Sequence, residues 1–162
     1  MELKQQRTKY QSILQQLIDP SSIDAFKCPF KYNAELREYQ QEGVNWLWFL
    51  HRFHLHGILA DDMGLGKTLQ SLLIIAASYL YDPSKHQYAD QEEEKKKTDE
   101  APINTTRKLP SLIICPATLV WHWPHEINKF IPNILAPFVI DGSASKRKEL
   151  YSQLIAKQGD DE

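Results

Sequence analysis

The sequence predicts an α/β fold in which a parallel β-sheet is flanked by helices. Short apolar runs alternate with longer segments whose apolar residues recur at helical spacing, and this order is typical of a parallel sheet. A glycine-rich turn separates one apolar run from the helix that follows it, which is the setting that a phosphate-binding loop requires. The 162 residues are enough for one ordinary domain.

Each element is predicted from its own pattern. Continuous apolar runs predict three strands, at residues 57–60, 112–115 and 137–140. The second run is suited to a strand covered on both faces. Apolar positions at a period near 3.6 predict helices, at about residues 10–18, 37–53, 69–80, 119–130 and 146–155.

The chain divides into a main part and three accessory segments. Residues 1–34 are predicted to form an N-terminal helix and an extended connector, and residues 35–158 form the main domain. Residues 82–110 are predicted to be a disordered insertion, because the stretch 91–100 has no apolar residue and a near-balanced charge. Residues 159–162 form a short tail.

Composition excludes several classes of protein. A hydrophobic fraction of 42% and a charged fraction of 25% are ordinary for a globular protein, which argues against wholesale disorder. The net charge of −2 gives no global sign of nucleic-acid binding, so any such contact must be local. No apolar run approaches the length needed to span a bilayer. Cys28 and Cys115 lie far apart, which favours a reducing compartment. We expect a soluble intracellular protein that does not bind membranes.

The glycine-rich turn carries the clearest chemistry. Backbone amides in such a turn point inward and bind phosphate oxygens, and the next helix adds its positive N-terminal end. Lys67 supplies an ammonium for the β- and γ-phosphates, and the Thr68 hydroxyl is a candidate ligand for Mg²⁺. The predicted ATP-binding loop is Asp61-Asp62-Met63-Gly64-Leu65-Gly66-Lys67-Thr68.

Other nucleotide-binding patterns fit less well. The general phosphate loop has glycine where this chain has Asp61, whereas Gly64 matches the helicase-like variant. A dinucleotide-binding turn would need a small residue at Leu69. A GTPase would need an aspartate two residues after Lys129, and the chain has isoleucine there. A small P-loop phosphotransferase and a non-catalytic nucleotide-binding module stay open as alternatives.

Three motifs around this loop resemble the Swi/Snf-type, helicase-like DNA-dependent ATPases. They occur in the family's order and spacing and cover about residues 35–140; they are Leu36–Leu47, Gly57–Thr68, and the segment from Leu112 to Leu119 followed by Trp123. Within that family the chain is similar to the ATPases that remove TATA-binding protein from DNA. That similarity rests on residues 17–21, 33–41 and 54–59 and on Asp62.

The resemblance implies a fold and several residue roles. Residues 35–158 would be part of a first RecA-like ATPase lobe, with Lys67 as its catalytic lysine. Gln40 would recognise the adenine edge of ATP, for which an amide has both donor and acceptor. Pro116, Ala117 and Thr118 would contact a DNA phosphate at the end of a strand. The implied setting is transcription regulation and chromatin remodelling in the nucleus, on double-stranded DNA, with TATA-binding protein as a partner of the full-length protein.

Members of this family orient the attacking water through an Asp-Glu-x-His-like motif that follows an apolar strand. No such motif occurs in this sequence, because Asp160, Asp161 and Glu162 follow Gly159 rather than an apolar run. We therefore expect the chain to be part of a longer motor and to be inactive alone. The histidines and tryptophans are assigned to the surface or to helix packing.

Overall fold

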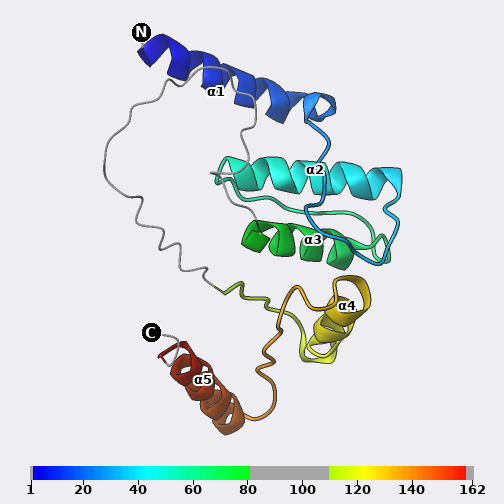
Figure 1. The fold of residues 1–162 in the computed structure, drawn as a ribbon, viewed down its shortest axis with the longest axis vertical. Coiled ribbons are helices and arrows are strands. Elements are labelled where there is room, and N and C mark those ends of the chain that lie inside the picture. The colour runs from blue at the N-terminus through cyan, green and yellow to red at the C-terminus, as the bar shows by residue number, and fades with distance from the viewer. Residues whose placement is uncertain (1, 81–109, 160–162) are drawn as a thin grey trace.

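The structure, a computed structural model, describes residues 2–80 and 110–159 (Figure 1). Its five α-helices are α1 (Glu2–Ile18), α2 (Glu38–Arg52), α3 (Lys67–Leu80), α4 (His122–Phe130) and α5 (Ala144–Gly159). Two short 3₁₀ helices are η1 (Pro20–Ser22) and η2 (Ala117–Leu119). Helices are present at all five predicted places, although α4 begins three residues later than expected. Figure 1 shows α1 and α5 at opposite ends of the molecule.

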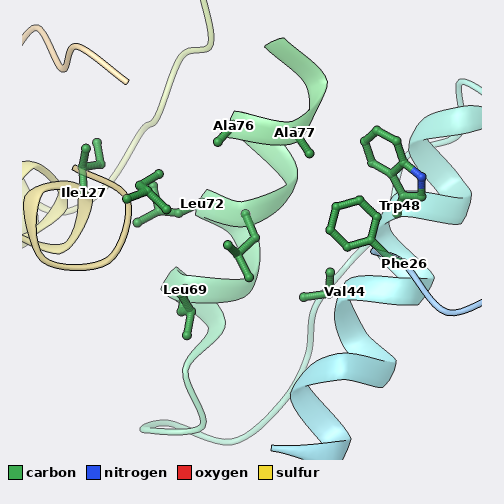
Figure 2. Packing of buried hydrophobic residues seen from close by; sticks show 10 residues of the cluster. Phe26, Val44, Trp48, Leu69, Leu72, Ala76, Ala77 and Ile127 are labelled. Carbon is green, nitrogen blue, oxygen red and sulfur yellow. The ribbon is translucent and has the colours of Figure 1, made fainter. Parts of the chain in front are cut away.

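Helix α3 is the centre of the hydrophobic core. One side of it packs against α2 and the connector before α2, and its other side packs against α4 (Figure 2). Leu72, Leu73, Ala76 and Ala77 on α3 are fully buried. The remaining buried members of the cluster are Phe26, Val44, Trp48, Leu69, Ile127 and Ile131. Because α3 begins directly after the glycine-rich turn, this core also fixes the position of that turn.

Specific hydrogen bonds cap both ends of α2. At its start, the Gln40 side chain accepts a hydrogen bond from the Arg37 backbone N–H at 3.0 Å, which is half of a capping box. At its end, His54 has a φ of +54°. The Leu55 N–H then bonds to the Leu50 carbonyl at 2.9 Å, a pattern that satisfies the last carbonyls of a helix.

The connector before α2 is held to that helix by polar side chains. The Asn45 side-chain oxygen accepts from the Phe26 N–H at 2.8 Å, and the Gln41 side chain donates to the Phe26 carbonyl at 3.1 Å. These bonds seat the Phe26 ring against Trp48, with 4.9 Å between ring centroids. Farther along, the Asn33 N–H bonds to the Phe130 carbonyl at 2.8 Å and ties the connector to the end of α4.

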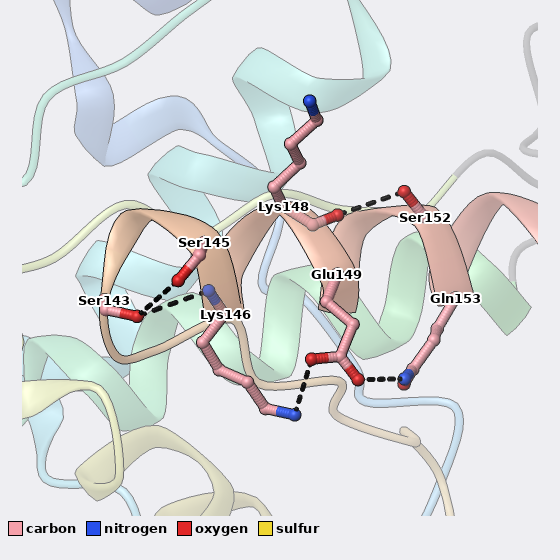
Figure 3. A network of polar contacts seen from close by, with 7 residues as sticks. All are labelled: Ser143, Ser145, Lys146, Lys148, Glu149, Ser152 and Gln153. Carbon is pink, nitrogen blue, oxygen red and sulfur yellow. Dashed lines mark hydrogen bonds and ion pairs between the residues drawn. The ribbon is translucent and has the colours of Figure 1, made fainter.

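Helix α5 depends mainly on contacts within itself (Figure 3). The Ser143 hydroxyl accepts a hydrogen bond from the Lys146 N–H at 3.3 Å at the helix start. One turn later Lys146 pairs with Glu149 at 3.0 Å, with both side chains more than half exposed. Ion pairs this exposed contribute little to stability. The basic residues at the start of α5 therefore lie on a solvated surface.

The predicted parallel sheet is wrong for the described part of the chain, which contains helices and no strands. The three apolar runs have no regular secondary structure, and a strand needs a neighbouring strand to accept and donate its backbone hydrogen bonds. The runs are also not covered on both faces, since Ile58, Leu112 and Ile114 are 85%, 80% and 88% exposed. The α/β fold class predicted from these runs is therefore not observed.

Two further predictions fall on residues outside this description. The predicted insertion lies there except for Pro110, and so do the last three residues of the tail, 160–162. Among the helices that the structure describes, none is long and apolar enough to cross a membrane.

Candidate functional site

The predicted phosphate loop lies between a segment without regular secondary structure and the start of α3. Gly64 and Gly66 both adopt left-handed backbone conformations, with φ of +86° and +81°. Glycine adopts this conformation without the strain that a side chain would cause. A Cβ on Gly64 would meet no atom within 4 Å, so its conformation is what demands glycine there, whereas a Cβ on Gly66 would collide with the Gln40 amide.

Lys67 is the first residue of α3, and its side chain folds back across the loop. Its ammonium donates to the Asp61 carbonyl at 2.6 Å and to the Asp62 carbonyl at 2.7 Å. Both partners are neutral backbone oxygens, so the positive charge of Lys67 is not cancelled by a carboxylate in these bonds. The loop thus presents a cation at a helix N-terminus, where the backbone dipoles also favour an anion.

Gln40 links α2 to the same loop. Its side-chain nitrogen donates to the Leu65 carbonyl at 2.9 Å, while its side-chain oxygen caps α2 as described above. Gln40 is 9% exposed. A primary amide has two donors and two acceptor positions, so one of each is left over after these two bonds. The residue predicted to read adenine is therefore also a structural link between α2 and the loop.

The predicted metal ligand, Thr68, is half-buried in the first turn of α3. No group of three or more His, Cys, Asp or Glu side chains gathers as a metal site in the described residues. Met63, beside the glycines, is 95% exposed.

The predicted DNA-contacting residues lie outside the phosphate loop, at η2. Pro116, Ala117 and Thr118 are exposed and sit at the start of η2, not at the end of a strand. The Pro116 carbonyl accepts from the Leu119 N–H at 2.8 Å, which closes the turn. Thr118 does not cap the next helix, because α4 begins at His122 and its N-cap residue is Trp121.

The sequence patterns missed two residues near the loop, Gln70 and Gly43. Gln70, in the first turn of α3, is fully buried, and its amide faces Gly43 of α2. The available signal was position, because Gln70 stands on the apolar face of α3 between Leu69 and Leu73. A glutamine on such a face is polar where the helical period demands an apolar residue.

Perturbed pKa values occur away from the loop. Burial raises the pKa of the Cys28 thiol, and a hydrogen bond to the Phe30 backbone partly offsets that effect. Burial, followed by the nearby His54, lowers the pKa of His51. The His51 ring stacks on Trp48, with 5.2 Å between centroids, as expected for a histidine used in packing.

Comparison with known proteins assigns the family. Residues 39–160 match the model of the SNF2-related domain. Over 94% of its length the chain is 46% identical to TATA-binding protein-associated factor MOT1 of Saccharomyces cerevisiae and 44% identical to TATA-binding protein-associated factor 172 of Homo sapiens. It is also 37% identical over 123 residues to the chromatin-remodeling ATPase INO80 of Gibberella zeae.

The chain spans only a small part of these relatives, 8% of the length of MOT1 and of factor 172 and 5% of INO80. The similarity nevertheless covers the phosphate loop, α2, and η2 with α4, which are the three places where the sequence motifs lie. The chain therefore belongs to the SNF2-related domain family.

Proposed function

We propose that this chain is the ATP-binding part of a DNA-dependent ATPase that acts in transcription regulation. The observation that carries the proposal is the Lys67 ammonium, held across a loop with two left-handed glycines at the start of a buried helix. A loop of this kind offers backbone amides, a helix N-terminus and a fixed cation to the same phosphate group. The family membership and the ATPase relative support the same reading.

Each residue of the loop has a separate task in binding. Lys67 exchanges its two carbonyl partners for phosphate oxygens, which bind an ammonium more strongly because they are charged. Gly64 and Gly66 let the backbone approach the phosphates closely. Thr68 offers its hydroxyl to Mg²⁺, and that ion neutralises phosphate charge when bound. Gln40 uses its remaining donor and acceptor for the adenine edge while it still holds the Leu65 carbonyl.

The proposed DNA-binding role belongs to the turn at η2. Pro116, Ala117 and Thr118 form an exposed turn that offers the Thr118 hydroxyl and backbone amides to a phosphate of duplex DNA. Such contacts position a protein on DNA and carry no sequence information. The names of the two similar TATA-binding protein-associated factors support a partner role for TATA-binding protein, which the full-length ATPase would remove from DNA in the nucleus.

Binding of a fluorescent ATP analogue tests the central claim. The purified chain is expected to bind the analogue with Mg²⁺, and Lys67→Ala is expected to weaken binding by at least about tenfold, because a charge-assisted contact is lost. Lys148→Ala is the matched control, since Lys148 lies on α5 and its side chain extends away from the other residues drawn in Figure 3, to which it is joined only through its backbone carbonyl. Equal binding by the wild type and Lys67→Ala would overturn the proposal.

A further inference from the structure

Two glutamine side chains lie in the contact between α2 and the start of α3, one from each side. Gln40 on α2 reaches over Gly66, and Gln70 on α3 reaches over Gly43. Gln40 and Gly43 are one helical turn apart, and so are Gly66 and Gln70, whose N–H bonds to the Gly66 carbonyl at 3.2 Å. Each glutamine therefore fills the space that a glycine leaves on the facing element.

The second of these contacts is unusual in its chemistry. Gln70 is fully buried, and neither its side-chain nitrogen nor its side-chain oxygen has a hydrogen-bond partner among the described residues. A buried amide without partners destabilises a fold relative to an apolar side chain of the same size. The contribution of Gln70 is therefore unlike that of its apolar neighbours on α3, which stabilise the core.

The position of Gln70 indicates what it does instead. Its amide lies against Gly43, with the side-chain carbon Cδ 3.2 Å from where a Cβ of residue 43 would be. This contact sets how closely α2 approaches α3. The same approach determines whether Gln40, one turn earlier on α2, reaches the Leu65 carbonyl of the loop.

We propose that Gln70 is a positioning residue of the nucleotide site, which acts by spacing α2 from α3 through its contact with Gly43. The inference rests on the proposed ATP-binding function of the loop. Gln70 does not touch the nucleotide, because it is fully buried. It acts through Gln40 and Leu65, so a change in the α2–α3 spacing alters the conformation of the loop and hence the affinity for ATP.

Gly43 is required by the same contact. A methyl group at position 43 would collide with the Gln70 side-chain oxygen. A glutamine amide on a protein surface would swing away, but Gln70 is enclosed on all sides and has no open space to enter. The methyl group therefore pushes α2 away from α3. In an unconstrained helix the same change from glycine to alanine stabilises the fold. Gly43→Ala should therefore be destabilising if the contact with Gln70 matters, and stabilising if it does not.

A double-mutant cycle tests the proposal with the fluorescent ATP analogue. Gly43→Ala alone is expected to weaken binding about tenfold, and Gln70→Ala alone, which leaves the space over Gly43 unfilled, is expected to weaken it by a similar factor. The double variant places a methyl group in that space, so it should bind more tightly than either single variant. Weakening that multiplies in the double variant would overturn the proposal.

Two further variants separate spacing from stability. Ile127→Ala shortens a buried side chain of α4, on the side of α3 that faces away from α2 (Figure 2), so it should lower the melting temperature while leaving the affinity unchanged. Gln70→Met keeps the length of the side chain without the amide, so it should raise the melting temperature and keep the affinity. Loss of affinity in Ile127→Ala equal to that in Gly43→Ala would show that the cycle reports stability only.

Hydrogen exchange of the backbone amides of residues 63–66, measured without nucleotide, tests independently whether the Gln70–Gly43 contact positions the loop. Exchange should be faster in Gly43→Ala and in Gln70→Ala than in the wild type, and should return toward the wild-type rate in the double variant. Unchanged exchange in both single variants would overturn the positioning role. Failure of the wild type to bind the ATP analogue would overturn the proposed function instead, whatever the exchange rates are.

Discussion

The amide of Gln40 makes two structural hydrogen bonds and keeps capacity for more. It caps α2 through Arg37, bonds to the Leu65 carbonyl of the loop, and keeps one donor and one acceptor for a ligand. These bonds fix the orientation of the amide before any base arrives. A preorganised group loses less entropy on binding than a mobile one, so Gln40 is suited to reading a base edge.

Gln40→Ala therefore has two expected effects. It should weaken ATP binding by about tenfold or more, because the tether to the loop is lost and so is the contact with adenine that we propose for Gln40. It should also reduce the preference for ATP over GTP, since the variant lacks the amide that we propose distinguishes the two bases. Competition of each nucleotide against the fluorescent analogue measures both effects.

The neighbouring Gln41 provides the control for that experiment. Its side chain bonds to the Phe26 carbonyl and to the Asn45 side chain at 3.1 and 2.7 Å, and to nothing in the loop. Gln41→Ala should reduce the free energy of unfolding by about 1 kcal/mol and leave nucleotide binding unchanged. An unaltered ATP-to-GTP preference in Gln40→Ala would show that Gln40 does not read the base.

At this scale the sequence predicted the local geometry of the loop, because the loop's requirements are local, whereas the binding roles of its residues stay predictions. Left-handed glycines and a lysine at the helix start follow from consecutive residues, and the structure has both. The contact of Gln70 with Gly43 joins residues 27 positions apart on two helices, as their numbers show. Helical periodicity says which face is buried but not which residue it meets, so no local pattern reveals this pair.

At the scale of elements, α3 links the site to the core. Its first turn carries Lys67 and Thr68, and its middle turns are enclosed between α2 and α4. The helices were predictable because each shows its own apolar period. The sheet was not, because an apolar run such as residues 112–115 contains no information about a neighbouring strand. In the structure these residues alternate between exposed and half-buried instead of being covered on both faces.

The importance of α3 is measured by shortening one of its core side chains. Leu72 is fully buried between α2 and α4, so Leu72→Ala should reduce the free energy of unfolding by about 2–5 kcal/mol. Leu80 at the end of the same helix is 47% exposed, and Leu80→Ala should change it by less than about 1 kcal/mol. Urea denaturation followed by tryptophan fluorescence measures both, and equal effects would contradict the central place of α3.

At the scale of the whole molecule, binding and hydrolysis have different requirements. The described part of the site offers a loop, a lysine, a threonine hydroxyl and an amide, all of which serve to hold a nucleotide in the proposed function. Hydrolysis also needs a group that orients the attacking water and a further cation for the charge that develops on the transferred phosphoryl group. The chain spans 8% of the length of MOT1, so such groups in the relatives have ample room elsewhere.

The purified chain is therefore expected to bind ATP without turning it over. Phosphate release should be no faster than that of Lys67→Ala, with or without duplex DNA, while binding of the fluorescent analogue shows that the wild-type site is intact. DNA-stimulated turnover that Lys67→Ala abolishes would contradict this prediction, since it would show that 162 residues contain every group the reaction needs.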